Sequence, residues 1–291
     1  MKPSILLQLD VDPQPSVFDG VVAVDAGVDH LFRHGGITPN AVRDLVHGTI
    51  FTRGGADLQR TAIFVGGSNV SSAEAVLKAV QGSFFGPFRT SVLFDANGCN
   101  TTAAAAVLAA MEGLTKARGS LAGARVAVLA ATGPVGQRVA RLLLRQDSSL
   151  EVRVASRTLD RAQATAAQLQ AATGRSPAAF ASATELELRH GLDGVDAIVA
   201  AGAAGVTLLP KSILESTGAR VLIDLNAVPP LGIDGVEATD KGKDRSGVLC
   251  WGALGVGGPK MKIHRRAIQA LFETNSALID AEECLEIGKS L

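Results

Sequence analysis

The sequence contains no tyrosine, a single tryptophan and only three cysteines among its 291 residues. Few aromatic side chains are therefore available to stack on bases. Its 28 basic residues only balance its 28 acidic residues, so the formal net charge is zero. Because proteins that bind nucleic acids usually carry an excess of basic charge, the composition argues against a nucleic-acid-binding protein.

The cysteines, Cys99, Cys250 and Cys284, lie far apart in the chain. Their spacing fits neither a zinc site nor the disulfide framework of a small secreted protein. Long apolar runs are also missing: the run at residues 5–7 ends at Gln8, and none reaches the roughly 18 residues of a membrane-spanning helix. We therefore expect a cytoplasmic protein without a signal peptide and without a membrane partner.

Apolar residues, in contrast, make up 47% of the chain, which is enough to fill sizeable cores. At about 150 residues per domain, the length suggests two domains. Short apolar runs alternate with amphipathic stretches, a pattern typical of strand–helix units around a parallel sheet. We predict an α/β protein with an N-terminal α/β domain (residues 1–119), a C-terminal Rossmann-type parallel-sheet domain (120–258) and final helices (259–291) that return to the first domain.

The expected secondary structure follows from these runs. In the first domain we expect strands at 4–9, 21–24, 62–65 and 91–94 and helices at 39–47 and 72–82. An alanine-rich helix should begin at 100–102, since Asn and Thr cap helices and Ala favours them. In the second domain we expect strands at 125–130, 151–155, 178–181, 196–200, 220–224 and 248–251, and the last helices at 259–272 and 277–288.

A glycine-containing loop follows the apolar run at 126–130 and precedes an amphipathic helix; its members are Ala131, Thr132, Gly133, Pro134, Val135 and Gly136. This strand–turn–helix order is typical of a dinucleotide-binding loop. Gly133 would let the backbone approach a pyrophosphate, and Gly136 would let the helix pack closely on the strand. Ala131 replaces the first glycine of that fingerprint, and the alternative is a tight turn that binds no ligand.

Ser156 and Arg157 follow the next expected strand, and Arg161 lies one helical turn further on. An NAD-binding site usually has Asp or Glu about 20 residues after the glycines, where it binds the ribose 2′-hydroxyl. A hydroxyl and two guanidinium groups suit a 2′-phosphate instead, so the sequence predicts NADP rather than NAD. Ala201 and Gly202 would let the nicotinamide ribose approach the backbone, although they also suit a simple packing turn.

Several longer strings are far more specific than this loop. They are PSVFD at 15–19, TIFTRGG at 49–55, AIFVGG at 62–67, FFGPFR at 84–89, DANGCNTTA at 95–103, NAVPPLGI at 226–233, ATDKGK at 238–243 and GALGVGGPKMKIHR at 252–265. Together with residues 132–136 they resemble the NADP-dependent methylene-tetrahydromethanopterin dehydrogenases of bacterial one-carbon metabolism. The resemblance spans almost the whole chain.

The resemblance implies a cleft between a pterin-binding domain and an NADP-binding domain. It implies the conversion of methylene-tetrahydromethanopterin and NADP⁺ to the methenyl cation and NADPH, and some relatives also accept methylene-tetrahydrofolate. It further implies a homo-oligomer, a trimer. Hydride transfer leaves a positive charge that two nitrogens share, so the reaction needs no general base, nucleophile or metal. The alternatives are a folate-specific dehydrogenase with cyclohydrolase activity and a non-catalytic NADP(H)-binding sensor.

Polar residues in these strings, with His30, are the candidate pterin contacts: Asp19, His30, Asp95, Asn97, Asn100, Thr101, Thr102, Lys260 and Lys262. Among them, Asp19, Thr102 and Lys260 are expected to position the substrate. The alternatives are loop capping for the aspartates, helix capping for residues 97–102 and a solvated helix face for the basic cluster 260–266. Asn226 and Leu254 complete the candidate cofactor contacts. His30 and His34 have metal-ligand spacing but no third ligand, so we predict no metal.

Overall fold

The computed structural model describes residues 2–291 and divides the chain into two compact units. Unit 1 comprises the residues up to Thr101 together with Met261–Leu291, and unit 2 is Thr102–Lys260. Both divisions fall inside long helices, α4 (Cys99–Arg118) and α9 (Ala253–Ala270), which therefore carry the chain from one unit to the other. The boundaries expected from the sequence, at residues 119 and 258, fall just after α4 and within α9.

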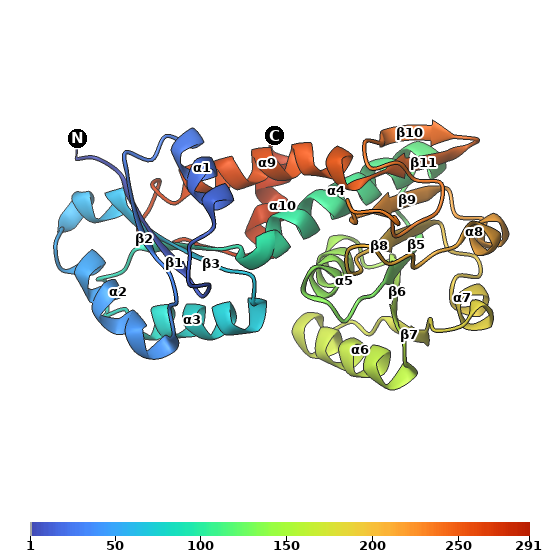
Figure 1. The fold of residues 1–291 in the computed structure, drawn as a ribbon, viewed down its shortest axis with the longest axis horizontal. Helices are drawn as coiled ribbons and strands as arrows, with labels where there is room; N and C mark the ends of the chain where they lie inside the picture. The colour runs from blue at the N-terminus through green and yellow to red at the C-terminus, as the bar shows by residue number, and fades with distance from the viewer. Residues whose placement is uncertain (1) are drawn as a thin grey trace. The chain divides into compact units, whose positions relative to one another are not determined.

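Unit 1 contains a five-stranded parallel sheet in the order β12-β4-β3-β1-β2. Figure 1 labels β1, β2 and β3 of this sheet. Its strands are β1 (Ile5–Asp10), β2 (His30–His34), β3 (Thr61–Gly66), β4 (Ser91–Phe94) and β12 (Leu278–Ile279). Its helices are α1 (Val17–Asp25), α2 (Val42–Ile50), α3 (Val70–Gly82) and α10 (Ala281–Lys289), with short 3₁₀ turns at Pro39–Ala41, Gly55–Arg60 and Ala96–Gly98. The strand order reverses between β1 and β3, and ligands of such sheets bind at the carboxyl ends of the strands at this point.

Unit 2 contains a seven-stranded sheet in the order β10-β11-β9-β8-β5-β6-β7. Its strands are β5 (Arg125–Leu129), β6 (Glu151–Ser156), β7 (Ala178–Ala181), β8 (Ala197–Ala200), β9 (Val221–Asp224), β10 (Lys241–Arg245) and β11 (Val248–Trp251). Its helices are α5 (Pro134–Gln146), α6 (Leu159–Thr173), α7 (Glu185–Gly191) and α8 (Lys211–Thr217). Among the described strands only β10 runs antiparallel, and the order reverses between β5 and β8. This is the Rossmann arrangement, and the predicted α/β class with two domains is confirmed.

One expected strand is wrong, because residues 21–24 lie in helix α1. The Ser16 side chain accepts a hydrogen bond from the Asp19 N–H and caps this helix, and Val22 and Ala23 face the core. A run of four apolar residues does not distinguish a strand from part of a helix. The true second strand is β2, an edge strand whose sequence HLFRH is too polar and too exposed to show an apolar run.

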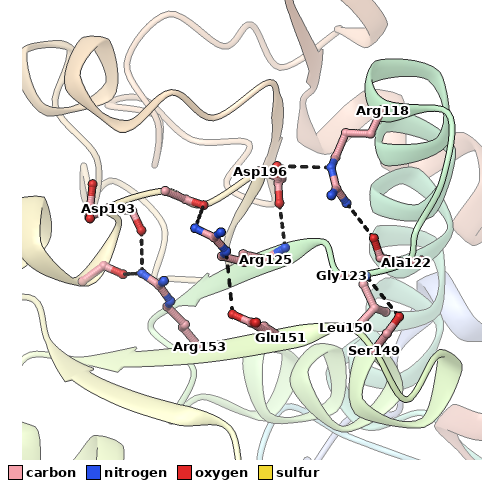
Figure 2. Close-up of polar contacts among 12 residues, drawn as sticks. Arg118, Ala122, Gly123, Arg125, Ser149, Leu150, Glu151, Arg153, Asp193 and Asp196 are labelled. Atoms are coloured by element: carbon pink, nitrogen blue, oxygen red, sulfur yellow. Dashed lines mark hydrogen bonds and ion pairs between the residues drawn. The ribbon is translucent and has the colours of Figure 1, made fainter.

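Polar side chains hold the amino edge of the unit 2 sheet together (Figure 2). Asp196 accepts a hydrogen bond from the Arg125 N–H at 2.8 Å. Arg153 donates to the carbonyl oxygens of Gly191 and Asp193, both at 2.8 Å, at the C-terminal end of α7 where a cation is favourable. The polar groups at the amino edge are therefore occupied by contacts within the protein. A ligand site is expected at the carboxyl edge instead. Across residues 2–291, no helix combines the length and apolarity needed to cross a membrane.

Candidate functional site

A cavity of about 640 Å³ opens at the carboxyl edge of the unit 2 sheet. Its walls come from the segments that follow β5, β6, β7 and β8, on both sides of the point where the strand order reverses. This is the usual position and size of a small-molecule or cofactor site. Seven of the candidate cofactor residues line it, namely Thr132, Gly133, Ser156, Arg157, Arg161, Ala201 and Gly202.

The loop after β5 needs its two glycines for different reasons. A Cβ on Gly136 would lie 2.8 Å from the Ala130 oxygen and from the Ala131 Cα, so no side chain fits between helix and strand. A Cβ on Gly133 would lie 3.5 Å from the Ala130 oxygen, an ordinary contact, but it would occupy space where the loop lines the cavity. Ala131 is buried, and its N–H donates to the Ala155 oxygen at 2.9 Å. Gly136 therefore serves packing, and Gly133 leaves room for a ligand.

Helix α5 begins at Pro134, directly after Gly133. Proline has no N–H and favours the first helical position, so the unpaired N–H groups of the first turn are those of Val135 and Gly136. The N-terminus of a helix attracts anions because these donors and the helix dipole point the same way. The residues present thus fit a pyrophosphate held between the loop and the start of α5.

The cavity wall beyond β6 is positively charged. Arg157 and Arg161 line it, both are exposed, and neither guanidinium has a hydrogen-bond or ion-pair partner in the described part of the chain. Ser156, which precedes them, is buried at the end of β6. The nearby Glu185 carboxylate lies 3.8 Å from the Arg189 guanidinium. Unpaired guanidinium donors beside a hydroxyl fit a phosphate group, as the sequence suggested for a 2′-phosphate.

One wall of the cavity was not anticipated from the sequence. It consists of residues after β8, including Val206, Thr207 and Leu208, and Ser182 and Thr184 after β7 add to the lining. The loop 226–233 supports this wall through two hydrogen bonds. The Thr207 hydroxyl donates to the Leu231 oxygen at 3.1 Å, and the Leu208 N–H donates to the Gly232 oxygen at 2.8 Å. The available signal was positional, since both segments follow carboxyl ends of parallel strands.

Six candidate cofactor residues lie outside the lining of this cavity: four belong to the loop after β5 and the start of α5 (Ala131, Pro134, Val135 and Gly136), and the other two are Asn226 and Leu254. Asn226 is buried; its Nδ2 donates to the Pro230 oxygen and its Oδ1 accepts from the Val228 N–H, both at 2.9 Å. Its amide therefore shapes the loop 226–233. Leu254 lies in the first turn of α9 and is exposed. The assignment of both as cofactor contacts stays a prediction.

Asp224, the last residue of β9, ties the same loop to the sheet. One carboxylate oxygen accepts from the Asn226 N–H and the other from the Ile233 N–H, both at 3.0 Å. A Cβ on Gly232 would lie 2.6 Å from the Asp224 Oδ1, so only glycine fits there. Burial raises the pKa of the Asp224 carboxyl, and its backbone hydrogen bonds only partly oppose this. Asp224 thus positions the loop that supports one wall of the cavity.

This raised pKa predicts how stability depends on pH. The unfolded carboxyl ionises near pH 3.9, but the folded carboxyl keeps its proton to a higher pH, so the folded state binds more protons in that window. The free energy of unfolding should fall as pH rises through the window and then level off. Asp224→Asn should remove this part of the decline. Urea unfolding of both proteins from acidic to neutral pH measures it, and parallel pH profiles would contradict the prediction.

In unit 1, the candidate pterin residues of the string 95–102 gather at the carboxyl end of β4. Asp95 is fully buried and accepts hydrogen bonds from the Asn100 N–H at 2.8 Å, the Thr101 N–H at 3.1 Å and the Thr101 hydroxyl at 2.6 Å. Asn97 is exposed in a left-handed conformation with φ 52°, and Thr102 is half-buried. Asp95, Asn100 and Thr101 therefore hold the start of α4, whereas Asn97 presents its side chain to solvent.

The other candidate pterin residues are spread over unit 1 and α9. Asp19 lies half-buried in the first turn of α1, and Lys260 and Lys262 lie on α9. His30 begins β2 and pairs with Ile5, so it lies at the amino edge of the sheet, opposite to Asp95. Since ligands of parallel α/β sheets bind at the carboxyl edge, the position of His30 does not support a pterin contact. The roles of the other residues stay predictions.

The carboxyl end of β1, where the order of the unit 1 strands reverses, is built by two further aspartates. Asp10 is fully buried and accepts from the Asp12 N–H at 2.9 Å and the Ser16 N–H at 3.0 Å. Asp12 in turn accepts from the N–H and the hydroxyl of Ser68, both at 2.8 Å. Gly67 has φ 118° and leaves no space for a side chain beside Asp10. Neither aspartate was among the candidate residues that the sequence suggested.

The cysteines are not placed to act as nucleophiles. No disulfide forms among them within residues 2–291, and all three are buried. Burial raises the pKa of the Cys250 thiol to about 11 and raises that of Cys284 well above its usual range. A thiol with such a pKa stays protonated at neutral pH and is a poor nucleophile and metal ligand. Nor do the described residues contain a group of three or more potential metal ligands.

Comparison with known proteins agrees with this geometry. Residues 17–97 match the model of the family described as methylene-tetrahydromethanopterin dehydrogenase, N-terminal. The chain is 44% identical to the "Bifunctional protein MdtA" of Methylorubrum extorquens, over the full length of both chains. It is 31% identical to an NAD(P)-dependent methylenetetrahydromethanopterin dehydrogenase of the same organism, covering 96% of this chain and 95% of the relative.

Among solved structures, a shikimate dehydrogenase in complex with NADP⁺ is similar in fold, with a TM-score of 0.50. The match covers 99% of this chain and 95% of the other, but only 12% of the aligned residues are identical. At this identity the likeness concerns the fold and not the reaction.

Proposed function

The chain belongs to the methylene-tetrahydromethanopterin dehydrogenase family, and we propose on this premise that it transfers a hydride from methylene-tetrahydromethanopterin to NADP⁺. The products are the methenyl cation and NADPH. The observation that carries the cofactor half of this proposal is the cavity at the strand-order reversal of unit 2, with Gly133 at the start of α5 and two unpaired arginines on its wall. A relative described as NAD(P)-dependent supports a nicotinamide dinucleotide as the cofactor.

Each part of this cavity suits one part of NADP. Gly133 and the first turn of α5 would hold the pyrophosphate, because a helix N-terminus offers N–H donors to an anion. Ser156, Arg157 and Arg161 would hold the 2′-phosphate. Ala201 and the wall that Asp224 supports through the loop 226–233 would face the nicotinamide ribose. Pro134 and Val135 would contribute by forming the first turn of α5, where Val135 offers its backbone N–H.

The bound cofactor supplies a nicotinamide ring that accepts the hydride at C4. The carbon–hydrogen bond of the methylene group breaks with both electrons, and the two neighbouring nitrogens share the positive charge that remains. No proton moves, so the protein needs no acid or base for this step. Its residues contribute by holding the reacting groups in line and by providing an environment that tolerates the cation.

For the pterin we propose the carboxyl edge of the unit 1 sheet, where Asp10, Asp12 and Asp95 build the loops after β1 and β4. Asp19, Asn97 and Thr102 would contact the pterin from the loop and helix starts, and Lys260 and Lys262 from α9. The position supports this assignment, because it is where the order of the strands reverses.

We also propose that the protein is cytoplasmic and forms a homo-oligomer, a trimer. Three cysteines without a disulfide suit a reducing compartment. Helix α1 exposes Val17, Val21 and Val24, which are spaced by four and three residues and so form one apolar stripe. Exposed apolar stripes of this kind are typical of contacts between proteins, which supports self-association.

The activity is tested by mixing the protein with NADP⁺ and methylene-tetrahydromethanopterin and following the absorbance of NADPH and of the methenyl product. We expect both to rise together at a rate proportional to protein concentration, and parallel reactions with methylene-tetrahydrofolate measure the preference between pterins. Binding of NADP⁺ without NADPH formation from either pterin would contradict the proposal and favour a sensor. Rapid hydrolysis of the methenyl product by the protein would favour a bifunctional folate enzyme.

A further inference from the structure

Unit 1 contains a second cavity, of about 540 Å³, that no part of the proposed reaction uses. It lies under α2, against the amino-terminal halves of β1 and β3 and the edge strand β2, away from the carboxyl edge of this sheet. Its volume is comparable with that of the cofactor cavity and typical of small-molecule sites.

One part of this cavity is apolar. Leu7 of β1 and Phe32 of β2 are opposite each other in the parallel register, and Ile5 precedes them on β1. Leu45 and Gly48 of α2 lie three residues apart and line the opposite wall. A Cβ on Gly48 would meet nothing within 4 Å, so the missing side chain leaves open space above the sheet. Phe32, on the edge strand of the sheet, is 51% exposed.

The other part of this cavity is polar and contains hydrogen-bond donors that are not used within the protein. Arg53 is half-buried, and its Nη1 donates to the carbonyl oxygens of Pro3 and Arg60, both at 2.9 Å. Within residues 2–291 the guanidinium makes no other hydrogen bond, so its Nε–H and Nη2–H groups remain available. These groups form a planar fork that matches the two oxygens of a carboxylate. The backbone contacts hold this fork in place before a ligand arrives.

Thr61 adds a second indication that the cavity takes a polar ligand group. It lines the cavity and is 4% exposed, and its Oγ1 is buried without a hydrogen-bond partner in the described part of the chain. Leaving a buried hydroxyl without a partner is costly, so such groups usually have a role. Thr61 pairs with Ile5 in the sheet, so the hydroxyl lies at the amino-terminal end of the apolar wall.

The group of this cavity that suits an anion is the Arg53 guanidinium, which has no ion-pair partner within residues 2–291. Lys2 also lines the cavity, but its ammonium lies 3.2 Å from an Asp57 carboxylate. We infer that this cavity is a second ligand site, for a small amphipathic monocarboxylate. Its carboxylate binds the Nε–H and Nη2–H groups of Arg53 and accepts a hydrogen bond from the Thr61 hydroxyl. Its hydrocarbon body lies between β1, Phe32 and α2.

Calorimetric titration of the full chain with octanoate tests the site, with 1-octanol and octyltrimethylammonium as probes of the same chain length. We expect one octanoate per chain and an affinity at least about tenfold above that of the neutral and cationic probes. Saturating NADP⁺ should leave octanoate binding unchanged, because the cofactor cavity lies in unit 2. Equal affinity for the three probes, or competition between octanoate and NADP⁺, would overturn the inference.

Two variants separate binding at this cavity from a structural effect. Gly48→Leu fills the cavity from a helix position that has room for a side chain, so octanoate affinity should fall at least about tenfold, whereas Gly48→Ala should retain most of it. Thr61→Val removes the unpaired hydroxyl, so it should raise the melting temperature of the ligand-free protein and yet weaken octanoate binding. Arg53→Gln should weaken binding too, but Arg53 also ties Pro3 to Arg60.

Unchanged octanoate affinity in both Gly48→Leu and Thr61→Val would overturn the assignment. The remaining possibility is that a second copy of the chain fills the cavity. In that case Gly48→Leu would dissociate the protein in analytical ultracentrifugation without any ligand present, and this result would also overturn it. An unchanged oligomeric state with lost octanoate binding supports it.

Discussion

Replacing Arg157 and Arg161 together with alanine should lower kcat/KM for NADP⁺ by about 100- to 1,000-fold while changing kcat/KM for NAD⁺ by less than about threefold. Both guanidinium groups line the cofactor cavity without a partner, so they are available to the 2′-phosphate. A hydrogen bond to a charged group contributes about 1.5–3 kcal/mol, and about 1.4 kcal/mol is a factor of ten. Steady-state kinetics with each cofactor measures the effect.

The control is Arg220→Ala, which removes an exposed arginine of the same unit outside the cavity lining. It should leave kinetics with both cofactors unchanged. The double variant should keep the melting temperature of the ligand-free protein, because neither side chain has a hydrogen-bond or ion-pair partner among residues 2–291 to lose. An equal loss of activity with NADP⁺ and NAD⁺ would show that the arginines do not recognise the 2′-phosphate.

Asp95→Ala should lower the free energy of unfolding by about 3 kcal/mol. The substitution leaves two buried N–H groups, those of Asn100 and Thr101, without their acceptor, and the Thr101 hydroxyl keeps only the Gly98 oxygen at 3.4 Å. The effect should extend to the C-terminal helix, because the Asn100 Nδ2 donates to Asp280 Oδ1 at 2.7 Å and Asp280 caps α10. Urea unfolding measures the loss.

Asp95→Asn is the matched variant and should cost only about 1 kcal/mol. The amide oxygen still accepts both N–H groups, and the Thr101 hydroxyl can turn to the Gly98 oxygen, 3.4 Å away. If this variant binds the pterin with an unchanged KM, Asp95 acts through α4 and not through the substrate. Unchanged stability of Asp95→Ala would contradict the structural role.

Much of the fold could be predicted from short-range pattern. The strands β4, β7 and β11 have the predicted bounds, because each is a short apolar run between turn residues. The edge strands β2 and β10 were missed because their polar, exposed sequences contain no apolar run, whereas the edge strand β7 was found because its sequence AAFA is apolar. The short strand β12 lies in the segment 277–288 that we expected to be helical; the helix there, α10, begins only at Ala281.

Part of the cofactor cavity was also predictable, because some of its lining residues form a pattern within a short stretch of sequence. The glycine loop is contiguous, and the serine and two arginines follow one strand later at a spacing set by the strand–helix–strand unit. The wall after β8 and the supporting Asp224 carry no comparable pattern. They belong to the cavity only because parallel strands end at the same edge of the sheet.

From the sequence alone follow the α/β class, the resemblance to one enzyme family and the glycine loop for which we propose a phosphate-binding role, all of which rest on residues that are neighbours in the chain. Only the tertiary structure decided which polar residues are already engaged with the protein itself. Asp95 and Asn226 have the side chains of ligand contacts, yet both hold loops through hydrogen bonds to backbone groups. Burial removes such groups from water and makes these internal partners necessary, and burial is a property of the folded chain.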